Sequence, residues 1–184
     1  MANIFQQLAQ ELGLSNQAAE ASADAAPPNS SNVALALTLS NQLLSGSEHL
    51  YLAGPGDATI TVANDQHNVI VGSSGADHLS GGKGPDVIIG GADTNVMTGN
   101  GGADIFAHVA GATDFITDFS PAAGEKIALA AGLSMTASHA TTVDPTTIGM
   151  PAGAGLPAVQ MNFSDGSTIT LVNSTAHPEA AWFL

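Results

Sequence analysis

Aspartate recurs at a fixed spacing inside glycine-rich loops of this chain. The segments "GSSGAD" (72–77), "GGKGPD" (81–86) and "GNGGAD" (99–104) end on aspartate, and "GGADTN" (90–95) ends on asparagine. Carboxylates, together with the carbonyl groups of a backbone that glycine allows to bend inward, are hard oxygen ligands. Because these loops contain no histidine or cysteine, the ligand set is typical of calcium and not of zinc or copper.

A single loop supplies too few oxygens for this chemistry. Calcium takes roughly six to eight oxygen ligands, which two loops facing each other could provide. We therefore expect "GGKGPD" (81–86) to form one half of a site whose other half is "GNGGAD" (99–104), 18 residues further along the chain.

The elements that position these loops follow from a nine-residue repeat. Over residues 45–107 the eighth position of each repeat is apolar in six cases out of seven, namely Leu52, Ile70, Leu79, Ile88, Met97 and Phe106, with Thr61 as the exception. The residues between successive loops are too few for a helix and suit a short strand. Alternating loops and strands with this period predict a coil of 18 residues per turn, in which like loops stack at about 4.8 Å.

Composition excludes several classes of partner. Sixteen acidic residues face only Lys83 and Lys126, which gives a net charge of −14. Nucleic acids and anionic membrane surfaces require a basic protein surface, so neither is an expected partner. The absence of cysteine excludes disulfides and thiolate metal sites. No N-terminal signal peptide or membrane-spanning run is expected, so membrane insertion is not predicted.

Three regions are expected along the chain. Residues 1–44 combine a predicted helix with apolar residues from Ile4 to Leu12, a linker at 27–32 and the strand "VALALTL" (33–39). Residues 45–119 contain the repeats. Residues 120–184 are expected to cover the last open turn, and "SDGS" (164–167) between two apolar runs predicts a β-hairpin there.

The repeat resembles a known family. Its pattern, G-G-x-G-x-D-x-U-x, is similar to the RTX (repeats-in-toxin) calcium-binding nonapeptide. Residues 113–132 resemble the D-x-I-x-D-F-x-x-G-x-D-K-I-x-L stretch that follows such repeats in serralysin-type proteins, with Glu125 in place of an aspartate. The chain's ending resembles a type I secretion signal, in which an acidic residue (here Glu179) precedes terminal hydrophobic residues.

The resemblance implies an all-β, right-handed parallel β-roll with calcium between stacked loops. It pairs 72–77 with 90–95 as a second site, and it implies weaker sites for 63–68 with 81–86 and for 54–59 with 72–77, where Asn68 and Thr59 hold the sixth position. Asp114 and Asp118 match family positions near the last turn. The implied calcium-binding residues are Gly72, Gly75, Asp77, Gly81, Gly82, Gly84, Asp86, Gly90, Gly91, Asp93, Asn95, Gly99, Gly101, Gly102, Asp104, Asp114 and Asp118.

These features predict a secreted protein that folds on calcium outside the cell. Extracellular calcium modules bind at about 10⁻⁴–10⁻³ M, far above cytosolic calcium. Export would use a type I transporter, and removal of the terminal "AWFL" is expected to block release while leaving calcium-dependent folding mostly intact. The sequence contains neither H-E-x-x-H nor G-x-S-x-G, so no enzyme activity is expected.

The expected role is a surface or biofilm-matrix component that assembles with itself, through "VALALTL" (33–39), or binds a cell-surface component. Other interpretations remain at this point. The chain could be the accessory module of a secreted protease, lipase or epimerase, or a small-ligand carrier. His49 and His67 could stack as a transition-metal pair, and His49 with Tyr51 could bind haem.

Overall fold

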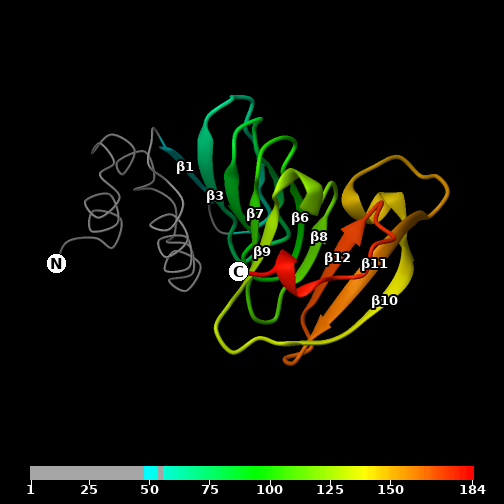
Figure 1. Cartoon of the computed structure of the whole chain (residues 1–184). Helices are drawn as coiled ribbons and strands as arrows, with labels where there is room; N and C mark the ends of the chain where they lie inside the picture. The colour runs from blue at the N-terminus through cyan, green and yellow to red at the C-terminus, as the bar shows by residue number, and fades with distance from the viewer. Residues whose placement is uncertain (1–47, 54–55) are drawn as a thin grey trace.

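The computed structural model describes residues 48–53 and 56–184 and shows two β-sheets wound from one coil (Figure 1). The expected N-terminal helix, linker and strand of residues 1–44 lie outside the described residues. Three short 3₁₀ turns, and no α-helix, occur in the described part: η1 (Pro121–Ala123), η2 (Pro145–Ile148) and η3 (Ala180–Trp182). None of the described helical segments is long and apolar enough to cross a membrane.

The first sheet contains five parallel strands that come from every second segment of the coil. Its order is β1-β3-β5-β7-β9, with β1 (Glu48–Leu52), β3 (His67–Val71), β5 (Asp86–Ile89), β7 (Ile105–His108) and β9 (Lys126–Leu129). The chain rises by one strand after about one turn of the coil, so Ile70 lies beside Ile88 and Ile88 beside Phe106. These β-branched and aromatic residues favour the extended backbone that the stack requires.

The second sheet begins with the alternate segments of the coil and ends with a cap. Its order is β10-β11-β12-β8-β6-β4-β2, with β2 (Thr59–Thr61), β4 (His78–Ser80), β6 (Thr94–Thr98), β8 (Thr113–Ile116), β10 (Met135–Val143), β11 (Leu156–Phe163) and β12 (Thr168–Val172). The strands from β2 to β8 and β12 are parallel, whereas β10, β11 and β12 pair antiparallel. The predicted all-β parallel roll with a β cap is confirmed, and so is the hairpin at "SDGS".

The core lies between the two sheets. The apolar column of the repeats fills it, and the same rows continue beyond the repeats. Its buried members include Ile70, Leu79, Ile88, Met97, Phe106, Ile116 and Ile127. The first sheet continues through β9, past the boundary expected at residue 119, because β9 pairs with β7 in parallel register.

The first two repeats are out of phase with the predicted column by one residue. Tyr51 pairs with Ile70, and Ile60 pairs with Leu79, so the register there is 19 residues and not 18. Tyr51 and Ile60 pack against the core, whereas Thr61 is exposed. Placing Leu52 and Thr61 in the core column was therefore wrong, because one extra residue in these turns shifts the alternation of the strand to its other face.

The C-terminal residues close the end of the first sheet. Leu184 donates its backbone N–H to the carbonyl of Ile127 at 3.1 Å, and Phe183 forms a bridge with Ile127. Trp182 is 6% exposed, belongs to the core, and has its ring centroid 5.4 Å from that of Phe119. The expectation that "AWFL" could be removed with little effect on folding is therefore not supported by the packing.

Candidate calcium sites

The sixth residues of the loops stack into two ladders, one for each set of loops. The loops before β3, β5, β7 and β9 place Asn68, Asp86, Asp104 and Glu125 in register, which we call the first ladder. The loops before β4, β6 and β8 place Asp77, Asn95 and Asp114 in register, which we call the second ladder. The predicted pairs of loops, 81–86 with 99–104 and 72–77 with 90–95, are thus neighbours in the roll.

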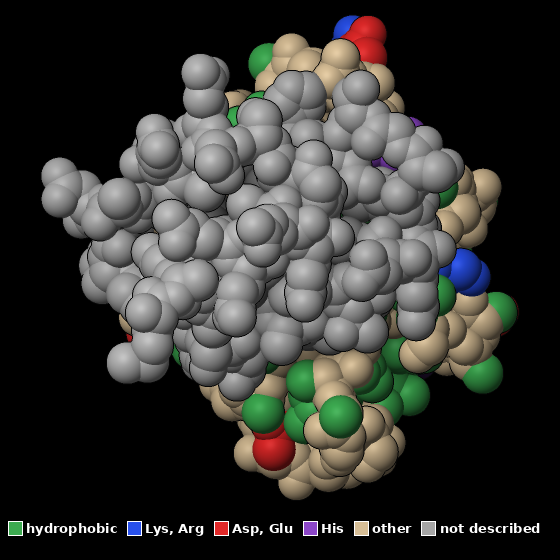
Figure 2. Space-filling view, turned by 90° about the vertical axis from the view of Figure 1, so that its left-hand side faces the viewer, with side chains coloured by type: hydrophobic (Ala, Val, Ile, Leu, Met, Phe, Trp, Pro, Cys, Tyr) green, Lys and Arg blue, Asp and Glu red, His purple; other side chains and the backbone are tan. Residues whose placement is uncertain are grey.

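Most acidic residues of the ladders are buried. Figure 2 shows a face on which the described side chains are mostly hydrophobic or uncharged, with charged groups scattered among them. The carboxylates of the ladders lie inside instead, and the buried ones are Asp77, Asp86, Asp104, Asp114 and Glu125. Burial of a carboxylate is costly unless donors or a cation compensate its charge, so each of these groups must be accounted for.

Hydrogen bonds connect each rung of the first ladder to the rung before it. Asp86 Oδ1 accepts the backbone N–H of Asn68 at 2.9 Å and its amide Nδ2 at 2.6 Å. The other oxygen of Asp86, Oδ2, accepts the N–H of Gly82 in its own loop at 2.6 Å. Both oxygens of Asp86 therefore have protein donors, although desolvation still raises the pKa of this carboxyl group.

Asp104 repeats this arrangement on one oxygen only. Its Oδ1 accepts the N–H of Asp86 at 2.8 Å, whereas its buried Oδ2 has no hydrogen-bond partner. The donor that would correspond to Gly82 is Asn100, and the N–H of Asn100 donates to Asp118 Oδ2 at 2.7 Å instead. Desolvation, with the charges of Asp86 and Asp118, outweighs the backbone hydrogen bond and raises the pKa of Asp104 to about 7.

Glycine at the first position of these loops leaves room for an ion. A Cβ atom at Gly99 would lie 2.3 Å from Asp104 Oδ2. A Cβ at Gly81 would lie 2.4 Å from Asp86 Oδ2 and 2.8 Å from the carbonyl oxygen of Gly99, in the next loop. Carboxylate and carbonyl oxygens from two stacked loops thus converge at spacings close to the calcium–oxygen distance of about 2.3–2.6 Å. These residues fit a calcium ion.

Glu125 extends the first ladder and was absent from the predicted ligands. Its side chain is buried, and its Oε2 accepts the N–H of Ser120 at 2.7 Å. Desolvation, and then the charges of Asp104 and Asp118, raise the pKa of Glu125 to about 7. The register from Ile105 to Lys126 spans 21 residues, which places Glu125 one rung after Asp104. The position of Glu125 in the D-x-I-x-D-F-x-x-G-x-D-K-I pattern was the signal that could have identified it.

The second ladder has a comparable site at Asp77. Asp77 Oδ1 accepts the N–H of Ala58 at 2.8 Å, and its Oδ2 accepts the N–H of Ser73 at 2.6 Å. A Cβ at Gly72 would lie 2.0 Å from the carbonyl oxygen of Gly90 and 2.6 Å from Asp77 Oδ2. Desolvation raises the pKa of Asp77. Loops 72–77 and 90–95 therefore bring the same types of oxygen together as the first ladder does.

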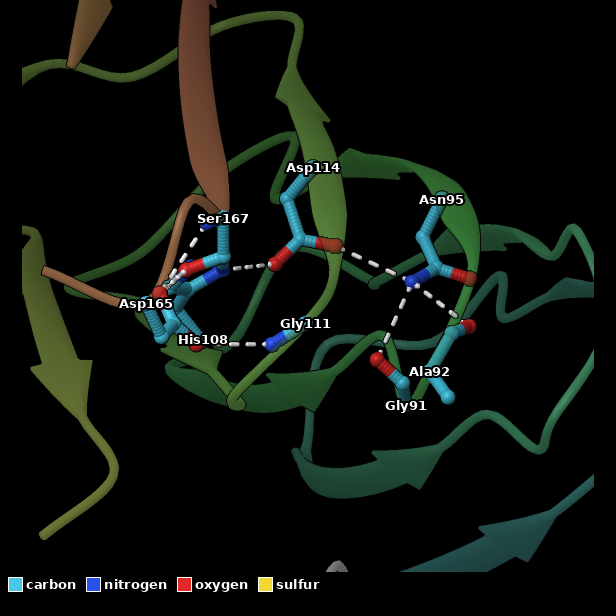
Figure 3. Close-up of polar contacts among 8 residues, drawn as sticks. All are labelled: Gly91, Ala92, Asn95, His108, Gly111, Asp114, Asp165 and Ser167. Carbon is cyan, nitrogen blue, oxygen red and sulfur yellow. Dashed lines mark hydrogen bonds and ion pairs between the residues drawn. The ribbon is translucent and has the colours of Figure 1, made fainter. Parts of the chain in front are cut away.

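Asp114, at the end of the second ladder, is bound by protein groups on both oxygens (Figure 3). Its Oδ1 accepts Nδ2 of Asn95 at 3.0 Å, and its Oδ2 lies 2.6 Å from Nδ1 of the buried His108. His108 Nε2 lies 2.8 Å from the hydroxyl of Ser167 in the cap. The structure thus gives Asp114 a structural role between roll and cap and does not place it in a calcium cradle.

The position of one proton in this network follows from its donors. The Ser167 hydroxyl lies 2.6 Å from Asp165 Oδ1, and hydrogen bonds from Ser167 lower the pKa of Asp165 to about 2. Asp165 is therefore ionised, so Ser167 donates its hydrogen to Asp165 and accepts one from His108 Nε2. His108 and Asp114 then share a second hydrogen at Nδ1. A proton-bearing pair compensates the buried carboxylate at this rung.

Ser167, His108 and Asp114 have the residue types of a hydrolytic triad without its function. Ser167 is 3% exposed, so an external substrate cannot reach its hydroxyl. Its hydrogen points to Asp165, which leaves His108 unable to accept it as a general base must. We interpret the chain of hydrogen bonds as a joint that holds the β11–β12 hairpin on the roll.

The remaining predicted residues divide between buried and exposed positions. Asp93 is exposed, has a φ of 70°, and accepts the N–H of Thr94 within its own turn. Asp118 is half-buried and accepts the N–H groups of Gly99 and Asn100. The predicted glycines that are buried are Gly72, Gly75, Gly81, Gly82, Gly84, Gly90, Gly91 and Gly99, whereas Gly101 and Gly102 are half-buried.

Side chains alone do not complete a metal site in the described part of the chain. No group of three or more histidine, aspartate or glutamate side chains is close enough there to hold a metal ion, so carbonyl oxygens must contribute. The predicted stacking of His49 on His67 is wrong, because His67 pairs with Glu48 and His49 pairs with Asn68. Adjacent strand residues point to opposite faces, so the two histidines do not lie one above the other.

Comparison with known families agrees with this geometry. Residues 63–106 match the family model described as the RTX calcium-binding nonapeptide repeat, in four copies. No curated protein matches the chain. The matched residues include the central rungs of both ladders, and they end before the segment 113–132 that resembles serralysin-type proteins. Residues 63–106 are therefore RTX calcium-binding nonapeptide repeats, and the chain is an RTX calcium-binding protein.

Proposed function

We propose that this chain is a secreted, non-catalytic RTX protein that folds on calcium outside the cell and serves as a structural component of a surface or biofilm matrix. The observation that supports this most is Asp104, which is 0% exposed and has one carboxylate oxygen without a partner. Such a group disfavours the folded state at neutral pH unless a cation binds it.

Calcium dependence follows from the whole set of buried carboxylates. Desolvation raises the pKa values of Asp77, Asp86 and Asp104, so each opposes folding as an anion. Calcium at 100 times its dissociation constant stabilises a one-site protein by about 2.7 kcal/mol. Several such sites would equal a large part of the stability of a typical domain, about 5–15 kcal/mol. Cytosolic calcium would leave them empty, whereas millimolar extracellular calcium would fill them.

The packing of the C-terminus supports export before folding. Trp182 is in the core and Phe183 pairs with β9, so the terminal hydrophobic residues are bound in the folded protein. A transporter that recognises these residues would therefore meet them only in the unfolded chain. Low cytosolic calcium would keep the chain in that state until it leaves the cell.

A structural role is favoured because the triad-like residues are closed to substrate. Ser167 and His108 are buried between roll and cap, and the hydrogen of Ser167 is directed to Asp165. The chain also contains one tryptophan and one tyrosine, which is little aromatic material for a substrate cleft.

A calcium titration of two matched variants tests the proposal. Asp104→Asn and Asp93→Asn each remove one negative charge with little change in shape, the first in the buried ladder and the second at an exposed turn. We expect Asp104→Asn to raise the calcium midpoint of folding, measured by far-ultraviolet circular dichroism, about tenfold or more because it removes a charged ligand. Asp93→Asn should leave it within about twofold. Equal midpoints for both variants would contradict a calcium site at Asp104.

A further inference from the structure

The outer edge of β10 is not paired with any strand in the part of the chain that the structure describes. β10 is the last strand of the seven-stranded sheet, and β11 lies on its other side (Figure 1). The corresponding end of the first sheet is different, because Phe183 and Leu184 pair with β9 there. The chain thus covers β9 with its own C-terminus and leaves the N–H and C=O groups along one side of β10 available.

β10 also lacks the features by which proteins protect an edge strand. It is nine residues long, "MTASHATTV", and contains no lysine, proline or acidic residue. Its one register irregularity is at the start, between Met135 and Ala137. Six of its nine residues are exposed, and threonine and valine favour a strand. Natural edges are normally shortened, charged or bulged to prevent pairing with another chain.

We propose that β10 is an interface strand that pairs antiparallel with β10 of a second copy of this chain, about a two-fold axis at His139. This register places Thr136 opposite Thr142 and Ser138 opposite Ala140. Threonine pairs and small pairs are well tolerated across strands, and a two-fold contact of one strand with itself is self-complementary. The two seven-stranded sheets would then form one continuous sheet.

The distribution of charge favours a second copy as the partner. Two molecules of net charge −14 repel each other over most of their surfaces. Between Lys126 and Asp165 the chain contains one charged residue, Asp144, which directly follows β10. In the proposed register Asp144 lies opposite residue 134, so the two Asp144 residues are ten residues apart, roughly 34 Å. That distance exceeds the Debye length of about 8 Å at physiological salt, so their repulsion is screened.

This inference rests on the proposed function only because β10 must be folded, and calcium-dependent folding is measured separately. It moves the site of self-association from "VALALTL" (33–39), which lies outside the described residues, to the cap. Lysine at position 139 would place two like charges opposite each other at the centre of the interface. Thr147 is exposed in η2, off the edge, and Thr147→Lys is a control with the same charge.

The test is sedimentation of the full chain at millimolar calcium over a range of protein concentration. We expect the wild type and Thr147→Lys to form dimers with the same dissociation constant and His139→Lys to remain monomeric, with circular dichroism showing that all three fold. Ala137→Lys, a second exposed position on β10, should behave as His139→Lys does. Hydrogen exchange of the wild type should show amide protection in residues 135–143 that increases with protein concentration.

Three results would overturn the proposal. They are a calcium-folded wild type that stays monomeric at high concentration, lysine variants that associate as the wild type does, and concentration-dependent protection located elsewhere, for example at residues 33–39. A wild type that fails to fold on calcium would instead contradict the proposed function, and circular dichroism identifies that case.

Discussion

Asp104 accepts the backbone N–H of Asp86, 18 residues earlier, at 2.8 Å, and keeps its second oxygen buried without a partner. The two residues are neighbouring rungs of one ladder, so one full turn of the coil brings two carboxylates and the carbonyl oxygens of their loops together. The same contact that fixes the register of the strands therefore also builds the calcium site. Folding and calcium binding should be a single process in this protein.

The first prediction concerns pH. Burial raises the pKa values of Asp104 and Glu125 to about 7, above their ordinary values of 3.8 and 4.5. Between pH 4 and 7 the folded state without calcium therefore binds more protons than the unfolded chain, so its free energy of unfolding falls as pH rises through this range. In chelator, β-structure measured by circular dichroism should be greater near pH 5 than near pH 8.

Calcium should compete with these protons. Binding near pH 6.5 should release protons, detectable by calorimetry in buffers of different ionisation enthalpy, and the calcium midpoint should fall as pH rises through about 7. The double variant Asp104→Asn/Glu125→Gln should lose most of this pH dependence. A calcium affinity that is constant from pH 5.5 to 8 in the wild type would show that these groups do not bind the ion.

The second prediction uses two glycines of one loop. A Cβ at Gly99 would lie 2.3 Å from Asp104 Oδ2, whereas a Cβ at Gly101 has its nearest neighbour, the Lys83 carbonyl oxygen, at 3.5 Å. Gly99→Ala should therefore raise the calcium midpoint about tenfold or more, because the methyl group occupies the space among the ligands. Gly101→Ala should change it little. Equal effects of the two substitutions would place the ion away from Asp104.

The third prediction separates Asp114 from the calcium ligands. Since His108 and Asn95 bind both of its oxygens, Asp114→Asn should leave the number of bound calcium ions unchanged. His108→Ala leaves the buried carboxylate without its partner and should destabilise the calcium-bound protein by roughly 3–5 kcal/mol in urea unfolding. Loss of one bound ion in Asp114→Asn, measured by calorimetric titration, would restore Asp114 as a ligand.

The fourth prediction concerns the C-terminus. Trp182 packs in the core, so Trp182→Ala should destabilise the calcium-bound protein by roughly 3–5 kcal/mol. The side chain of Leu184 is 61% exposed, and its contact with β9 uses the backbone, so Leu184→Ala should change stability by less than about 0.5 kcal/mol. Similar urea midpoints for the two variants would mean that the tail does not pack as the structure shows.

The architecture could be predicted from sequence because the repeat states it several times. The apolar column from Ile70 to Phe106 recurs at nine-residue spacing, and only a coil of short strands keeps these side chains on one face. The prediction slipped at Tyr51 and Ile60, where one additional residue per turn changes the phase. A degenerate repeat does not show such an insertion, since glycine and aspartate also occur at neighbouring positions of the same loop.

The candidate sites were predictable only in part, for a similar reason. Asp86 and Asp104 are marked by the glycines around them. Glu125 is separated from the repeats by η1, and nothing local to it shows that β9 returns to the roll. His108 compensates Asp114 by a contact with Ser167, 59 residues further along the chain, and such long-range hydrogen bonds leave no periodic signal.

The most direct measurement is the circular dichroism spectrum of the full chain as calcium rises from submicromolar to several millimolar. The buried, partly unpartnered carboxylates predict a chain with little β-structure in chelator at pH 7.5 and a cooperative conversion to a β-rich form near millimolar calcium. Magnesium at the same concentration should not produce it, because these sites are built from many oxygens without the octahedral geometry that magnesium demands. An identical spectrum and melting temperature in chelator and in calcium would contradict calcium-dependent folding.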